Sequence, residues 1–197
     1  MPSAPPRRDA ADRRAQVLAV AVGLAEESGL DQLGAAAVAT RAGVSKPLVF
    51  HYFGTAAGLR RAVALTAVEH AREALGAPPA GPADPAAAAA PLAAFLDAVV
   101  ARRSTWQGIW QGALAGDAPT EAALADLRTG LVDRLTAAPR RADTPRARLL
   151  TSGWVALAEH LVAAWLAGGT DVSRDELEGL VLETFAQLAG ALTRDGA

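Results

Sequence analysis

The stretch LGAAAVATRAGVSKPLVFHYF, residues 33–53, predicts two short helices joined by a tight corner. Small and apolar residues recur at helical spacing over residues 35–42, with Val38 and Ala39 on the inward face. Gly43 follows them, and glycine takes the left-handed conformation that ends a helix without steric cost. Such a pair is a helix-turn-helix, whose second helix can enter a DNA major groove about 12 Å wide.

The second helix of the pair has its own start signal. Ser45 is a good N-cap, because its hydroxyl accepts a hydrogen bond from a free N–H of the first turn. Pro47 lies in that first turn, where a missing N–H is tolerated. Residues 48–52 continue the helix. We expect its apolar side chains to be core residues: Leu48, Val49 and Phe53.

The run ATRAGVSKPLVFHYF, residues 39–53, closely resembles the signature of the tetracycline-repressor (TetR) family of bacterial transcriptional regulators. The resemblance extends back through residues 17–30 and forward to Leu59. The rest of the chain resembles the family only in its pattern of helices. A corner of Ala-Gly-Val-Ser alone is weak evidence, whereas the corner joined to the Phe-His-Tyr-Phe-Gly ending is specific.

This resemblance implies an all-α fold of about nine helices. It places a three-helix helix-turn-helix head with a flexible N-terminal arm at residues 1–55, and a helical effector-binding and dimerisation domain at residues 56–197. The expected function is that of a ligand-responsive regulator, with repression the commoner behaviour. The expected partners are double-stranded operator DNA, a small apolar effector and a second copy of the chain. No cofactor is expected.

Seven residues of the helix-turn-helix are candidates for contacts with DNA. Lys46 is the strongest, because a cation in the first turn reaches a phosphate or a guanine edge. The alternative for these residues is an ordinary solvated helix face. The candidates are Thr40, Arg41, Ser45, Lys46, Pro47, Phe50 and His51.

Three positions depart from the family pattern, and each departure removes a phosphate contact. Leu33 and Gly34 stand where the family often has Thr or Ser. Phe50 stands where it often has Tyr, and Ala56 where it often has Lys. The head therefore depends more on its remaining basic residues, or it binds weakly.

Charge and composition limit the alternatives. Residues 1–60 hold seven basic and five acidic side chains, and the remaining residues hold 12 and 16, so a head of +2 precedes a body of −4. The first residues have no apolar core, so they do not form a signal peptide. There is no cysteine and no uninterrupted apolar run of membrane-spanning length. We therefore expect a cytoplasmic protein without a membrane span.

Local signals predict where several helices begin. Asp12 is an expected cap for the first helix. Four arginines lie near it, and they form either an arm that follows DNA phosphates or a solvated tail. They are Arg7, Arg8, Arg13 and Arg14. Ser104 is an expected cap further along the chain. The spacing of Ser173 and Glu176 is that of a capping box.

Four tryptophans lie in the body and none in the head. Large aromatic side chains among small ones can form the walls of an apolar ligand cavity, although for any single Trp burial in the core is the better interpretation. The predicted ligand-binding residues are Trp106, Gln107, Trp110, Trp154 and His160. A place on the surface or in a dimer seam is an equally good interpretation of His160.

The last two predicted helices suggest a dimer interface. One carries a stripe of small residues, which allows close packing of helices, and the other has a long apolar face. By resemblance such helices form a four-helix interface, and the alternative is that they only close the monomer core. The predicted interface residues are Gly153, Ala164, Leu177, Leu180, Val181, Thr184 and Phe185.

Catalytic and metal-binding patterns are missing from the sequence. It has no Gly-x-Ser-x-Gly, no phosphate-binding loop and no pair of histidines at metal-ligand spacing. We therefore expect no enzymatic activity. The leading alternative to a regulator is a helical small-molecule-binding or interaction protein whose DNA binding is weakened.

Overall fold

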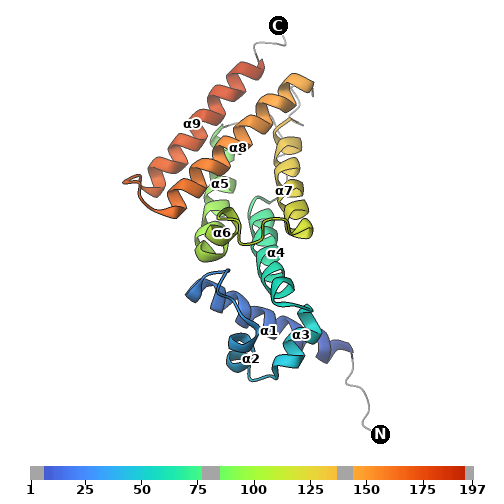
Figure 1. Ribbon diagram of the computed structural model, residues 1–197. Helices are drawn as coiled ribbons and strands as arrows, with labels where there is room; N and C mark the ends of the chain where they lie inside the picture. The colour runs from blue at the N-terminus through green and yellow to red at the C-terminus, as the bar shows by residue number, and fades with distance from the viewer. Residues whose placement is uncertain (1–6, 77–84, 137–143, 194–197) are drawn as a thin grey trace. The chain divides into compact units, whose positions relative to one another are not determined.

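A computed structural model of the chain describes residues 7–76, 85–136 and 144–193 (Figure 1). These residues form nine α-helices and no strand, which confirms the predicted all-α fold. The helices are α1 (Arg7–Ser28), α2 (Ala35–Ala42), α3 (Lys46–Phe53), α4 (Ala56–Ala74), α5 (Pro85–Val100), α6 (Arg103–Trp110), α7 (Ala118–Thr136), α8 (Pro145–Ala167) and α9 (Arg174–Thr193).

The chain forms two compact units. The first comprises Met1–Ala67 and Arg102–Thr120, and the second comprises Val68–Ala101 and Glu121–Ala197. The first unit thus extends beyond the predicted domain boundary at residue 55 and includes α6. A compact unit is not the same as a functional domain, so that boundary stays a prediction.

Some predicted helix starts hold and others shift. Helix α1 begins at Arg7, five residues before Asp12, so residues 7–14 are helical and not a flexible arm. No Pro or Gly interrupts the sequence from Arg7 to Val22, which explains the longer helix. Residues 1–6 lie outside the described part of the chain.

The capping box at α9 is confirmed. The backbone N–H of Ser173 donates to the Glu176 carboxylate at 2.8 Å, and the N–H of Glu176 donates back to the Ser173 hydroxyl at 3.2 Å. The backbone N–H of Ser173 and then its hydroxyl, which both donate to the carboxylate, hold the pKa of Glu176 below its usual value. Helix α6, in contrast, begins at Arg103, so the predicted cap Ser104 lies inside it.

The first unit has its core between α1, α2 and α3. One face of α1 is buried from Val17 onward, and α1 packs against α2, which packs against α3. Val38 and Ala39 are buried as predicted, as are Val49 and Phe53, whereas Leu48 is only half-buried. The buried residues of the α1 face are Val17, Ala21, Leu24 and Ala25.

Helix α6 is fixed to α1 by an N-terminal cap from another helix. The Glu26 carboxylate accepts the N–H of Ser104 at 2.8 Å, the N–H of Thr105 at 3.1 Å and the Thr105 hydroxyl at 2.5 Å. A carboxylate at this end also meets the positive end of the helix dipole. One turn later, a Cβ added to Gly108 would lie 2.8 Å from the Leu30 Cβ, so only glycine fits this contact.

A second polar contact in this unit joins α4 to the start of α7. Arg61 donates to both carboxylate oxygens of Asp117, with its Nε 2.9 Å from each, and Asp117 accepts from the N–H and hydroxyl of Thr120. The hydrogen bonds from Arg61, followed by those from Thr120, lower the pKa of Asp117 from 3.8 to about 2.

This shift predicts a pH-dependent contribution to stability. A carboxylate whose pKa is lowered by folding stabilises the fold above its unfolded pKa, and the contribution is lost as pH falls from about 4 to about 2. Asp117→Asn is therefore expected to cost up to about 2 kcal/mol at pH 7, because one pKa unit corresponds to about 1.4 kcal/mol and the partly exposed Arg61 screens the pair. Urea unfolding from pH 7 to pH 3 measures this.

Asp133→Asn is the matched control. Asp133 is also paired with an arginine, Arg148 at 2.8 Å, but its side chain is 52% exposed. Exposed ion pairs contribute little, so this variant should lose well under about 1 kcal/mol. Equal losses from the two variants, or a loss at Asp117 that does not shrink at low pH, would contradict the assignment.

The second unit is a bundle in which α9 packs against α8 and α5. Its core includes Val162 and Leu166 of α8 and Leu177, Val181 and Phe185 of α9. By length and composition alone, α8 is also apolar enough to cross a membrane. The core helix of a soluble protein can be equally long and apolar, so these two properties are weak evidence that α8 spans a membrane.

Candidate nucleic-acid interface

The corner between α2 and α3 forms as its residues predict. Gly43 has a φ of +65°, and its N–H donates to the Thr40 carbonyl at 3.3 Å, while the N–H of Val44 donates to the Ala39 carbonyl at 3.0 Å. The hydroxyl of Ser45 then accepts the N–H of Leu48 at 3.4 Å and caps α3. The corner therefore sets the direction of α3 relative to α2.

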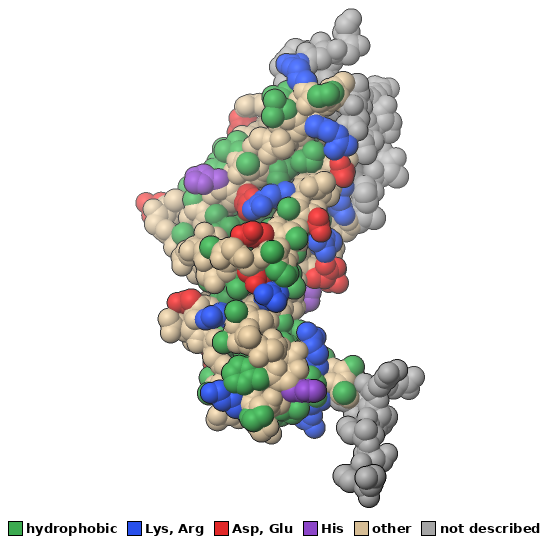
Figure 2. Space-filling model, turned by 45° about the vertical axis from the view of Figure 1, so that its right-hand side comes forward, with side chains coloured by type: hydrophobic (Ala, Val, Ile, Leu, Met, Phe, Trp, Pro, Cys, Tyr) green, Lys and Arg blue, Asp and Glu red, His purple; other side chains and the backbone are tan. Residues whose placement is uncertain are grey.

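Most of the predicted DNA-contacting side chains face solvent. Phe50 is half-buried, and the other six are exposed: Thr40, Arg41, Ser45, Lys46, Pro47 and His51. The structure therefore leaves these six side chains accessible to DNA, and the contacts themselves stay a prediction. Figure 2 shows basic side chains and a histidine on the surface of this first unit.

Arg41 is already bound to a carboxylate. Its Nη1 and Nη2 donate to the two oxygens of Glu27 at 3.0 and 2.9 Å. These hydrogen bonds raise the pKa of Arg41 and lower that of Glu27. To reach a phosphate, Arg41 must first leave Glu27, which weakens its case as a DNA contact.

Two other cations of the first unit lie over aromatic rings of α3. The Lys46 Nζ lies 5.7 Å from the centroid of the Phe50 ring, and the Arg14 Cζ lies 5.1 Å from that of Phe53. The Arg14 contact was missed in the sequence, since 39 positions separate the two residues and no local pattern connects them.

The departures from the family pattern have visible consequences. Gly34 is the N-cap residue of α2 and has no side chain to cap it. At α4 the cap is present, because the Thr55 hydroxyl accepts the N–H of Gly58 at 2.9 Å, but Ala56 in its first turn supplies no cation.

The predicted ligand-binding residues are divided between the two units. Trp106, Gln107 and Trp110 lie on α6 in the first unit, and Trp154 and His160 lie on α8 in the second. Trp106 is only 2% exposed and stacks on Trp110 with ring centroids 5.1 Å apart, so it is a core residue of its unit. Trp154 donates its indole N–H to the Thr184 hydroxyl at 3.1 Å, and His160 is exposed.

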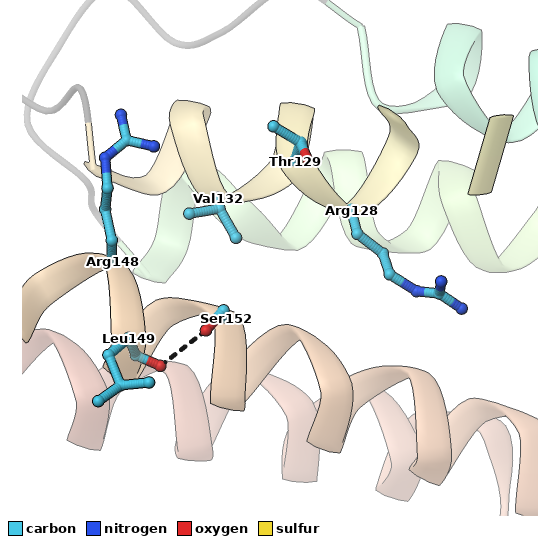
Figure 3. Close-up of a pocket in the computed structure, with 6 residues that line it drawn as sticks. All are labelled: Arg128, Thr129, Val132, Arg148, Leu149 and Ser152. Carbon is cyan, nitrogen blue, oxygen red and sulfur yellow. Dashed lines mark hydrogen bonds between the residues drawn. The ribbon is translucent and has the colours of Figure 1, made fainter. Parts of the chain in front are cut away.

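An open surface pocket of about 350 Å³ lies between α7 and α8 in the second unit (Figure 3). The residues that line it are Arg128, Thr129, Val132, Arg148, Leu149 and Ser152. Both of its arginines are held by carboxylates, Arg128 by Glu159 and Arg148 by Asp133. None of the predicted ligand-binding residues lines this pocket, so their role stays a prediction.

The predicted interface residues fall into two groups. Leu177, Val181 and Phe185 are at most 2% exposed within a single chain, so they belong to the monomer core and offer little surface to a partner. Thr184 is half-buried and accepts the Trp154 hydrogen bond. The residues that remain accessible to a second copy are Gly153, Ala164 and Leu180.

Within the described residues, no cluster of His, Cys, Asp or Glu could hold a metal ion. The structure instead shows a helix-turn-helix with an exposed cation in the first turn of its second helix, followed by a helical bundle. These features define a DNA-binding regulator of the helix-turn-helix class.

The chain belongs to the TetR family of bacterial regulatory proteins. Residues 17–63 match the family's N-terminal region, and residues 87–188 match the tetracyclin repressor-like C-terminal domain. Regulators of this family bind operator DNA and act as dimers with small-molecule effectors. Helix α6 therefore belongs to the C-terminal domain by sequence but packs with the N-terminal helices.

Solved structures have the same fold. A tetR-family transcriptional regulator from Streptomyces coelicolor is 26% identical, with a TM-score of 0.82 over 94% of this chain and 88% of that one. A TetR transcriptional regulator from Rhodococcus sp. RHA1 is 22% identical (TM-score 0.62, 90% and 94%). The multidrug binding protein EbrR, complexed with imidazole, is 21% identical (TM-score 0.69, 89% and 94%). Among curated proteins, none matches significantly.

Proposed function

We propose that this regulator acts in the cytoplasm as a homodimeric repressor that binds a palindromic operator and is released by a small apolar molecule. The observation that carries the DNA-binding part is the exposed first turn of α3, with Ser45, Lys46 and Pro47 accessible to solvent. In a dimer, two such helices about 34–36 Å apart would fit successive major grooves.

The effector part rests on the family and on the similar fold of EbrR, which holds a small molecule. An effector acts by favouring a spacing of the two heads that does not fit DNA. To reverse a 99:1 preference for the DNA-binding spacing, the effector must bind the state with the other spacing about 10⁴-fold better. Trp110 is half-buried, in contrast to Trp106, which makes it the better candidate of this pair for a ligand contact.

A specific observation also supports the alternative of a ligand-binding protein with weakened DNA binding. Arg41 is held by Glu27, and Phe50 and Ala56 supply neither a hydroxyl nor a cation. A titration against salt separates the two functions, because a regulator that neutralises several phosphates loses affinity steeply as salt rises. A shallow dependence would favour the alternative.

Lys46→Ala tests the operator contact itself. We expect the variant to fold normally and to lose about 1–3 kcal/mol of affinity for a duplex selected from a random pool, if Lys46 contacts a base edge. Titration of the selected duplex by fluorescence anisotropy measures the loss.

Lys46→Arg is the control, since it keeps the positive charge at the first turn. It should retain most of the affinity and the same preferred base, because Arg and Lys both bind the O6 and N7 edge of guanine. Unchanged affinity of Lys46→Ala at moderate salt would remove Lys46 from the interface.

A further inference from the structure

The side chain of Arg14 lies at the C-terminal end of α3 because of its place on α1. It stands three and seven residues before Val17 and Ala21, so it continues the buried stripe of α1 beyond the edge of the core. At that position it is exposed, and its guanidinium lies over the ring of Phe53, the last residue of α3.

Among the described residues, no carboxylate engages the guanidinium of Arg14. Within the described residues its contact is the Phe53 ring, and the contact of Lys46 is likewise a ring, that of Phe50. Two other arginines of the first unit are paired with carboxylates, Arg41 with Glu27 and Arg61 with Asp117. Arg14 and Lys46 can therefore bind an anion without first breaking an ion pair.

The two residues lie at opposite ends of α3, although the Lys46 Nζ leans back over the ring of Phe50. Lys46 is the first of the eight residues of α3 and Arg14 stacks on the last, so the ends are about 11 Å apart at 1.5 Å per residue. This length is close to the width of the major groove, about 12 Å. A helix that lies across the groove would thus bring each of its ends toward a different sugar–phosphate backbone.

We propose that Arg14 binds a backbone phosphate at the C-terminal end of α3, across the groove from the backbone that the Lys46 end approaches. The proposal rests on the proposed DNA-binding function and adds a contact that lies on α1, outside the helix-turn-helix. Phe53 is 8% exposed and acts as a positioning residue, since its ring holds the guanidinium at this end of α3. Such a contact orients the protein on DNA and carries no base information.

Salt-dependent binding of a random-sequence duplex tests the proposal. Each neutralised phosphate contributes about −0.9 to the slope of log K against log salt. For each bound subunit, Arg14→Ala should make the slope shallower by about 0.9 and lower affinity about eightfold at 0.1 M salt, equally for all sequences. Arg14→Lys keeps the charge but not the planar group, and should keep most of the slope.

Arg72→Ala is the matched control, because it removes the same charge from an arginine whose side chain is 41% exposed and is paired with Glu69. It should bind as the wild type does, and thermal unfolding should show all variants folded. A wild-type slope for Arg14→Ala, or an equal loss for Arg72→Ala, would overturn the Arg14 contact alone. A shallow slope for the wild-type protein would overturn the DNA-binding function, and the Arg14 contact with it.

Discussion

Trp106→Ala is expected to destabilise the protein by about 3–5 kcal/mol, the range for removing a large aromatic side chain from a packed core. Trp106 is 2% exposed and stacks on Trp110, and it lies on the helix whose first turn is capped by Glu26. Its loss leaves a cavity that α6 cannot close, because Gly108 already packs directly on Leu30. Chemical denaturation followed by circular dichroism measures the change.

Trp106→Phe is the control. The indole N–H of Trp106 is buried and has no hydrogen-bond partner among the described residues, so phenylalanine removes this donor along with part of the ring. We expect it to cost less than half as much as alanine. A loss below about 1 kcal/mol for Trp106→Ala would mean that the site is loosely packed, and would restore Trp106 as a cavity-lining residue.

Leu180→Glu is expected to convert the proposed dimer to a folded monomer. Leu180 is 41% exposed in the single chain, so a carboxylate there stays hydrated when the monomer folds. In a dimer seam on α9 the same carboxylate would be buried, and desolvation costs several kcal/mol per ion. Analytical ultracentrifugation at micromolar concentration should show the monomer, against a dimer for the wild type.

Ala125→Glu places the same charge on an exposed position of α7 and should leave the dimer intact. Phe185→Glu is unsuitable for this test, since Phe185 is 2% exposed in one chain and its substitution would unfold the monomer. An unchanged dimer for Leu180→Glu would place the interface elsewhere. A monomeric wild type would overturn the proposed dimer itself.

Local sequence predicted the helix-turn-helix because its determinants are local. The left-handed Gly43, the cap by Ser45 and the inward Val38 each depend on neighbours within a few residues, and the structure shows all three. The capping box of Ser173 and Glu176 is confirmed for the same reason. The prediction that Ser104 caps α6 was wrong. The acceptor at this helix end is Glu26, which lies 78 residues upstream of Ser104.

The candidate sites were harder to predict, since the burial and the ion pairing of their side chains depend on residues distant in sequence. Arg41 has the right charge for DNA, but only the fold shows that Glu27 already holds it. Phe185 fits an apolar seam as well as a core, and the packing of α9 against α8 and α5 decided for the core.

The sequence by itself therefore determined the class of protein, because a helix-turn-helix is specified by short-range caps, turns and helical periodicity. Only the tertiary structure decided which side chains remain accessible to a partner. It bound Arg41 to Glu27, buried Trp106 and left Arg14 over Phe53 at one end of α3. Burial and charge pairing arise from contacts between distant segments, and no local pattern in the chain encodes them.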